Sequence, residues 1–253
     1  ELVGAKEPPL RYAAGRVSLP WQDYAEKVLG RSAYNLHNAG EYTTDLFIKK
    51  WNATTIDDLF SKTRQDFASL NLRKGEDLYW EVQAWKSGAP VLRCDNNGNP
   101  ILPQFPKNKH VFYFDIETSF ATYPDIAPHI YLCGLCDSSG KYTHFLAAGE
   151  RQESQMLEQF CDFVMSFGKD VVLFCWSKYE FEQLESASRR QRQLFGKLKF
   201  ILEHLVDLKE CICGPVFFPV KSYAIDTLAK FAGFTWRTKE IHNGLEAMVY
   251  YWN

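Results

Sequence analysis

The sequence lacks a surplus of positive charge. It contains 29 Lys and Arg residues against 31 Asp and Glu residues, which gives a net charge of −2. Proteins that bind nucleic acids indiscriminately usually carry a broad basic field. The charge balance excludes binding of that kind, so any contact with a nucleic acid must depend on a local patch.

Long apolar runs and paired cysteines are also missing. No stretch approaches the roughly 18 to 20 residues that a helix needs to cross a bilayer, and no basic start followed by an apolar core marks a signal peptide. The seven cysteines do not follow the paired spacing of secreted domains. We therefore expect a cytoplasmic protein without a membrane partner.

Zinc and phosphate-loop motifs are absent as well. None of the six histidines forms a His-x-x-x-His pair, and no Gly-rich phosphate loop is present. Cys133 and Cys136 have the spacing of a zinc or redox pair, but they lie in an apolar run without a second pair. We interpret them as buried structural cysteines.

The sequence does contain ample material for packed cores. Apolar residues make up 46% of the 253 residues and aromatic residues 15%, and the length favours two domains over one. A polar stretch rich in Asn, Gly and Pro begins at Cys94 and continues through Pro103 and Pro106. We place the domain boundary there, with a mainly helical domain at 1–105 and a second domain at 106–253.

Helical patterns dominate the first domain. Residues 21–29 have apolar side chains at helical spacing after Pro20, and residues 54–60 resemble a threonine-capped helix start with acids in its first turn. Residues 78–85 continue with a helical period.

Strands dominate the start of the second domain. The pattern predicts strands at 111–116, 129–136 and 141–146, a helix at 150–167, a strand at 171–176 and a helix at 179–195. The short turns between the first three strands indicate antiparallel pairing. The order βββαβα predicts an α/β fold with a mixed sheet and flanking helices.

Two acids stand at the end of the first of these strands. Asp115 and Glu117 are two residues apart, so both carboxylates lie on one face of the strand. Such a pair can hold Mg²⁺ or Mn²⁺ and leave positions open for water and a phosphate oxygen. A pair of solvated acids is the alternative interpretation. Glu180 follows the strand at 171–176 and begins a helix, where it would face the first two acids.

These features resemble a known family, the ribonuclease-H-like domain at the C-terminal end of RecB-like nucleases, which are related to the DEDD exonucleases. The resemblance runs from about Phe112 to Asn253. It is carried by Phe114-Asp115-Ile116-Glu117, Tyr131-Leu132-Cys133-Gly134-Leu135, Tyr179-Glu180, Val206-Asp207-Leu208, Ser222-Tyr223-Ala224-Ile225-Asp226 and Gly233-Phe234-Thr235-Trp236. It implies a ribonuclease-H-like fold and a metal-dependent exonuclease that hydrolyses single-stranded ends of DNA or RNA by a two-metal mechanism.

The resemblance assigns roles to four acids. Asp115 and Glu117 match the first motif, and Glu180 matches the second, where many relatives have Asp. These three are the expected ligands of Mg²⁺ or Mn²⁺, with Asp115 bridging both ions. Asp207 matches a later acid and is a further catalytic candidate, although capping of a helix is an equally good interpretation.

The chain departs from the family at three places. Cys175 stands where close relatives often have His, and Asp226 where they often have Lys; both changes would alter the grip on the substrate. The fourth acid of the family would come after Asn253. We therefore expect a fragment of a longer chain that carries further nuclease or helicase domains. We also expect loose metal binding and slow or no turnover in this chain, with activity restored by extension past Asn253.

A set of basic side chains suggests where phosphates would bind. It comprises Lys178, Arg189, Arg190, Arg192, Lys197 and Lys199. A solvated helix face is an equally good interpretation. If the acids are inactive, the same groove and basic residues would form a catalytically silent nucleic-acid-binding or interaction module, which is the alternative function.

The helical segment at 45–91 resembles the helix-hairpin-helix element that precedes the nuclease domain in these relatives. Residues 54–59 match the entry of that motif, but Asn52-Ala53 replaces its expected glycine. A contact with the DNA backbone and a purely structural helical spacer are both compatible with this sequence.

Overall fold

The computed structural model describes residues 31–119, 128–235 and 251, and the chain forms two compact units. The helical unit comprises Glu1–Pro103 and Cys213–Thr235, and the sheet unit comprises Gln104–Ile212 and Trp236–Asn253. The helix expected at 21–29 lies outside the described residues.

The helical unit is built mostly from short helices, as the sequence predicts. In chain order its elements are η2 (Ala33–Asn35), α2 (Glu41–Trp51), η3 (Asp57–Leu59), α3 (Arg64–Ala68), α4 (Gly75–Ser87), β1 (Val91–Leu92), β7 (Val216–Phe217) and α9 (Ile225–Phe231). β1 and β7 pair antiparallel. Phe47, Ile56, Phe67, Leu78 and Val82 are fully or almost fully buried and form the core of this unit.

The helix expected at 54–60 is shorter than predicted. Only η3, a three-residue 3-10 helix, forms there, because the Asp58 carboxylate accepts the backbone N–H groups of Thr54 and Thr55 at 3.0 and 2.9 Å. These contacts hold the segment in a turn. Asn52 ends α2 with φ 51° and ψ 34°, a left-handed conformation that glycine favours and Asn tolerates.

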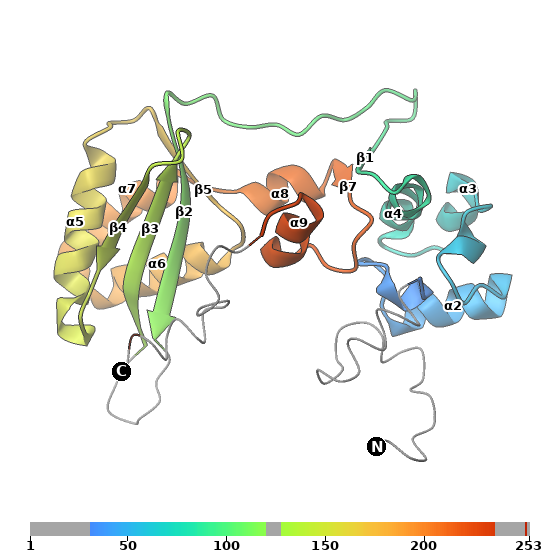
Figure 1. The fold of residues 1–253 in the computed structure, drawn as a ribbon, viewed down its shortest axis with the longest axis horizontal. Helices are drawn as coiled ribbons and strands as arrows, with labels where there is room; N and C mark the ends of the chain where they lie inside the picture. The colour runs from blue at the N-terminus through green and yellow to red at the C-terminus, as the bar shows by residue number, and fades with distance from the viewer. Residues whose placement is uncertain (1–30, 120–127, 236–250, 252–253) are drawn as a thin grey trace, which may run out of the picture. The chain divides into compact units, whose positions relative to one another are not determined.

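The sheet unit contains a five-stranded mixed sheet of order β4-β3-β2-β5-β6 (Figure 1). Its strands are β2 (His110–Ser119), β3 (His129–Asp137), β4 (Tyr142–Leu146), β5 (Val171–Cys175) and β6 (Leu205–Asp207). β2, β3 and β4 pair antiparallel, as their short turns predict, whereas β5 pairs parallel with β2 and β6.

Helices cover one face of this sheet. α5 (Glu153–Met165), α6 (Tyr179–Arg190) and α7 (Phe195–Glu203) contribute side chains to the core beneath it, and the unit also contains η4 (Glu150–Gln152), η5 (Arg192–Leu194) and most of α8 (Leu208–Cys213). The prediction of a single helix at 179–195 is wrong about where that helix ends. α6 stops at Arg190, and Gln191 leaves the helical conformation with φ −103° and ψ 66°.

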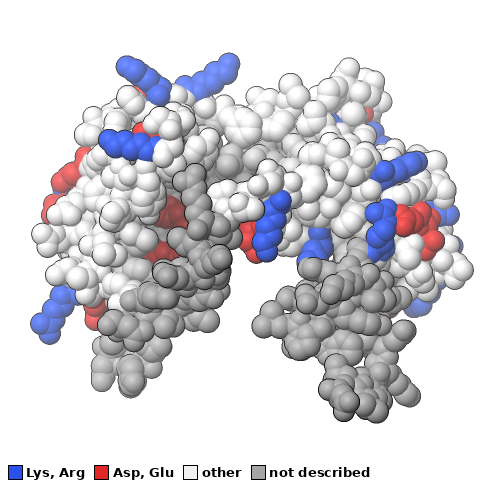
Figure 2. Space-filling view, in the orientation of Figure 1, with Lys and Arg blue, Asp and Glu red and all other residues white. Residues whose placement is uncertain are grey.

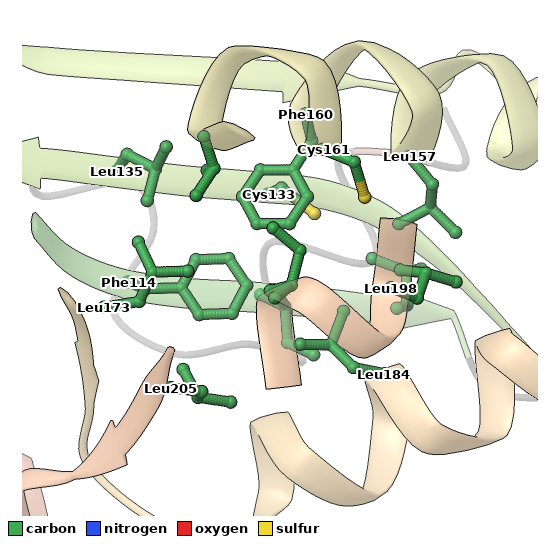
Figure 3. Packing of buried hydrophobic residues seen from close by; sticks show 14 of the residues in the cluster. Phe114, Cys133, Leu135, Leu157, Phe160, Cys161, Leu173, Leu184, Leu198 and Leu205 are labelled. Carbon is green, nitrogen blue, oxygen red and sulfur yellow. The ribbon is translucent and has the colours of Figure 1, made fainter. Parts of the chain in front are cut away.

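The alternation along β2 separates the core from the opposite face. Phe112, Phe114 and Ile116 are buried in the core, and the Phe114 ring stacks on Phe160 of α5 with 5.1 Å between centroids (Figure 3). Cys133 is fully buried there, as expected, whereas Cys136 is only half-buried, so the prediction of two buried cysteines is wrong for the second. The chain is thus an α/β protein with a mixed sheet, flanking helices and a helical N-terminal region. In the described part, no helix is long and apolar enough to cross a membrane.

Candidate functional site

Three of the predicted acids meet where two parallel strands end. Asp115 and Glu117 lie in β2 on the face opposite the core. The parallel pairing between β2 and β5 ends at Tyr113 and Phe174, so the chain leaves the sheet beside Asp115. It turns immediately into α6, whose second residue is Glu180. The fold therefore brings a carboxylate pair and a third acid from a distant segment to one end of the sheet.

The pKa values of these acids indicate that their charges repel one another. Burial, together with the nearby charge of Asp115, raises the pKa of Glu117 to about 6. Burial also raises the pKa of Glu180, again with a contribution from Asp115. Asp115 is exposed in part, but the protein atoms around its carboxylate exclude enough water to raise its pKa. The Ile116 N–H donates to Asp115 Oδ1 at 3.0 Å and lowers the pKa by a smaller amount. Asp115 thus interacts with both other acids.

Local hydrogen bonds hold Glu180 in place. The Ser177 hydroxyl donates to Glu180 Oε2 at 3.2 Å and accepts the backbone N–H of Tyr179 at 3.2 Å. The Glu180 residue is 5% exposed. A buried carboxylate that keeps a polar partner remains oriented rather than mobile.

Asp207 has a structural role. It ends β6, pairs with Cys175 of β5, and accepts the backbone N–H of Glu210 at 3.2 Å. This contact caps the first turn of α8, which agrees with the alternative interpretation of this acid. Its catalytic role stays a prediction.

Hydroxyl groups lie next to the acids, and the sequence did not predict them as part of the site. Thr118 and Tyr179 share a short hydrogen bond. Tyr131 lies at the irregularity of β3 opposite Glu117 and Thr118, and its ring stacks on Tyr251 with 4.1 Å between centroids. Its hydroxyl is buried and has no hydrogen-bond partner in the part of the chain that the structure describes. The sequence contains Tyr131 in a recognisable motif, but only the register of the strands places it beside Glu117.

The donor set suits a hard divalent cation. Carboxylate oxygens are the ligands that Mg²⁺ and Mn²⁺ prefer, and a cation would offset the burial and the repulsion that raise these pKa values. Within residues 31–119 and 128–235, however, no three His, Cys, Asp or Glu side chains are arranged closely enough to hold an ion. The three acids therefore have the donor atoms and the negative charge that a divalent cation needs. Their side chains would have to move to bind it together.

Residues 112–253 match the family model of the RNase H superfamily. The chain belongs to the RNase H superfamily. A family B DNA polymerase from the hyperthermophilic archaeon Pyrobaculum calidifontis is similar over 76% of this chain, with 17% identity and a TM-score of 0.42. The match covers 31% of the polymerase, so this chain spans about a third of that protein. No curated protein matches the chain.

The basic residues expected to contact phosphates mostly have acidic partners in this RNase H superfamily domain. Lys178 pairs with Glu210 at 2.8 Å, Arg189 with Glu185 at 3.1 Å, Arg190 with Glu153 at 2.7 Å, Lys197 with Glu158 and Asp162 at 2.9 and 2.7 Å, and Lys199 with Glu203 at 3.7 Å. Arg192 is exposed, and the described residues include no acidic partner for it. Figure 2 shows the visible Lys and Arg side chains spread over the surface rather than joined in a basic band. Phosphate binding would have to compete with these ion pairs.

The two positions at which the chain has a different residue from the family lie in different units. Cys175 is buried, burial raises its pKa to about 12, and its thiol donates to the carbonyl oxygens of Ser177 and Val206. A protonated thiol of this kind is a poor nucleophile and a poor metal ligand. Asp226 lies in α9, which belongs to the helical unit.

Proposed function

We propose that this RNase H superfamily chain is a metal-dependent nuclease that hydrolyses single-stranded ends of DNA or RNA as an exonuclease. The observation that carries the proposal is the convergence of Asp115, Glu117 and Glu180, in which burial and the charge of Asp115 raise the pKa values of both glutamates. Such a concentration of acids on an open sheet face weakens the fold unless a cation offsets it.

In this proposal Asp115, Glu117 and Glu180 hold Mg²⁺ or Mn²⁺ in a two-metal mechanism. A bound divalent ion polarises the phosphate and lowers the pKa of its water. Ser177 orients the Glu180 carboxylate through its hydroxyl. Asp115 has the central position, because it interacts with each of the other two acids, and Asp207 is the further catalytic candidate.

The test is a Mn²⁺ titration of the wild-type chain and of Asp115→Asn. The substitution keeps the shape of the side chain and removes its charge. We expect Mn²⁺ affinity to fall at least about tenfold, since one of a few hard ligands is lost. The melting temperature without metal should stay the same or rise, because removal of one charge relieves repulsion among the acids.

Asp162→Asn is the matched control. Asp162 lies on the exposed side of α5, where it pairs with Lys197, and it is not one of the acids proposed to bind the metal. This variant should bind Mn²⁺ as the wild type does. Wild-type affinity in Asp115→Asn would contradict the assignment of the site.

A catalytically silent binding module is the second candidate. It is favoured by the finding that no group of three potential ligands in the described residues is arranged to hold an ion. This module would bind a labelled single-stranded oligonucleotide equally well with Mn²⁺ or EDTA and would not cleave it. Cleavage in Mn²⁺ that Asp115→Asn abolishes would rule it out.

A further inference from the structure

Tyr142 lies across the neighbouring strand β3 instead of standing clear of the sheet. It pairs with Cys136 in the register of β4 and β3, and its side chain reaches back over Gly134. A Cβ atom added to Gly134 would lie 2.7 Å from the Tyr142 hydroxyl and 3.2 and 3.3 Å from two ring carbons. The ring can occupy this position only because residue 134 has no side chain.

This position brings the Tyr142 hydroxyl towards the candidate acids. Gly134, which lies beneath the ring, is paired with Asp115 in the adjacent strand. The charges of Asp115 and Glu117 both act on the hydroxyl and, after burial, raise the pKa of Tyr142. A tyrosine hydroxyl is protonated at neutral pH, so this one can donate a hydrogen bond beside the acids.

The ring of Tyr142 remains open to solvent. The residue is 59% exposed, and its ring stacks on His144 of the same strand with 5.8 Å between centroids. Tyr113 lies on the same face of the sheet and is 50% exposed. Aromatic rings on an open sheet face are a common platform for unpaired bases, because every base offers a flat surface for stacking.

Strand propensity alone does not explain this arrangement. An aromatic residue on an edge strand needs no glycine on the neighbouring strand, and a side chain at residue 134 would simply turn the ring outwards. The combination of a missing Cβ, an exposed ring and a hydroxyl near two acids points to a contact with a ligand.

We propose that Tyr142 positions the substrate, with its ring stacked on a base of a single-stranded DNA or RNA end and its hydroxyl directed to the backbone beside Asp115. This inference rests on the proposed function, because it takes a nucleic acid as the ligand of the acidic site. Single strands are specified because a base within a duplex has no free face for the ring.

The test compares two labelled probes of equal length in Mn²⁺: a phosphorothioate oligothymidylate and the same backbone without bases. Fluorescence anisotropy gives the dissociation constant for each. The wild-type chain should prefer the probe with bases. Tyr142→Ala should weaken binding of that probe about tenfold and leave binding of the abasic probe nearly unchanged, since loss of one stacked base costs about five- to a hundredfold in affinity.

Three further variants separate stacking from other effects. Tyr142→Phe should keep the preference for bases, because the ring remains. Gly134→Ala should reduce it, because the new methyl group would displace the ring. Tyr42→Ala is the matched control, since Tyr42 is 71% exposed on α2 of the helical unit and should have no effect.

The outcomes distinguish this inference from the proposed function. An unchanged preference for bases in Tyr142→Ala overturns the role of Tyr142, even if Asp115→Asn loses Mn²⁺ binding and the proposed function stands. A wild-type chain that binds both probes equally also overturns it. A tenfold loss confined to the probe with bases supports it, and the Mn²⁺ titration then tests the acids separately.

Discussion

At the scale of single residues, Glu81 is a buried titratable group in the helical unit. It is completely buried in α4 and accepts the backbone N–H groups of His37 and Asn38, the latter at 3.1 Å. The Asn38 side-chain amide also donates to it at 3.2 Å. Burial nevertheless dominates and raises the pKa of Glu81 to about 8.

Because of Glu81, we predict that the free energy of unfolding falls as pH rises. The unfolded chain loses the Glu81 proton near its ordinary pKa, whereas the folded chain keeps it until about pH 8. The folded state therefore binds more protons between these values, and the free energy of unfolding should fall by up to about 1.4 kcal/mol per pH unit there. The contribution of Glu81 to stability is complete below its pKa in the unfolded chain, and it is lost as the pH rises through its pKa in the folded chain.

Urea unfolding followed by tryptophan fluorescence at several pH values measures this effect. Glu81→Gln should flatten the pH dependence between about pH 5 and pH 8, because glutamine does not titrate. If the variant retains the slope of the wild type, another group is responsible.

Only part of the candidate site could be predicted from the sequence. Asp115 and Glu117 could be predicted because the strand period alone places them on one face, and Glu180 because it follows a buried strand. Tyr142 could not be predicted, because its contact with Gly134 depends on how β3 and β4 are aligned, and local sequence does not determine that register.

At the scale of secondary structure, the strands were easier to predict than the helix ends. The runs expected at 111–116 and 171–176 correspond closely to β2 and β5, since buried apolar side chains mark them clearly. The helix expected at 179–195 ends early because tertiary contacts override its local pattern. Arg190 and Gln191 both donate to the buried Glu153 carboxylate, at 2.7 and 3.1 Å.

Glu153 should therefore be important for the stability of the sheet unit. It joins the end of α6 to the start of β3, because its carboxylate also accepts the Ile130 N–H at 2.9 Å. Glu153→Ala leaves that buried N–H and the Arg190 guanidinium without their partner. We expect a loss of about 1–3 kcal/mol in the free energy of unfolding, since Arg190 is still partly reached by water.

Glu185→Ala provides the comparison for this prediction. It removes the exposed partner of Arg189 on the same helix, and it should change stability by no more than about 0.5 kcal/mol. Equal losses in the two variants, measured by chemical unfolding, would contradict a special role for Glu153.

At the scale of the whole molecule, the predicted boundary can be tested by limited proteolysis. Residues 101–108 form neither a helix nor a strand, and Ile101 and Leu102 are 42% and 60% exposed. Exposed segments of this kind are the usual sites of first cleavage. We expect the earliest cuts between 94 and 108, mapped by mass spectrometry. Early cuts inside 111–176 would contradict the division.

The sequence did not predict that the helical unit is discontinuous. The domain expected at 106–253 was drawn as one block, whereas Cys213–Thr235 groups with the first hundred residues. The short strands β1 and β7 are responsible, because they pair Val91 with Phe217 and Leu92 with Val216. Two-residue strands carry too little periodic pattern to be recognised from sequence.

The pairing of β1 with β7 has a consequence for the order of folding during synthesis. A ribosome releases the chain from its N-terminus, and domains generally fold as they emerge. All five strands of the sheet unit precede β7 in the chain, so that sheet can assemble while the helical unit still lacks its last segments. The helical unit, although its first segments are translated earliest, therefore cannot be completed until the five strands of the sheet unit have emerged, and β1 has no strand partner until β7 follows them.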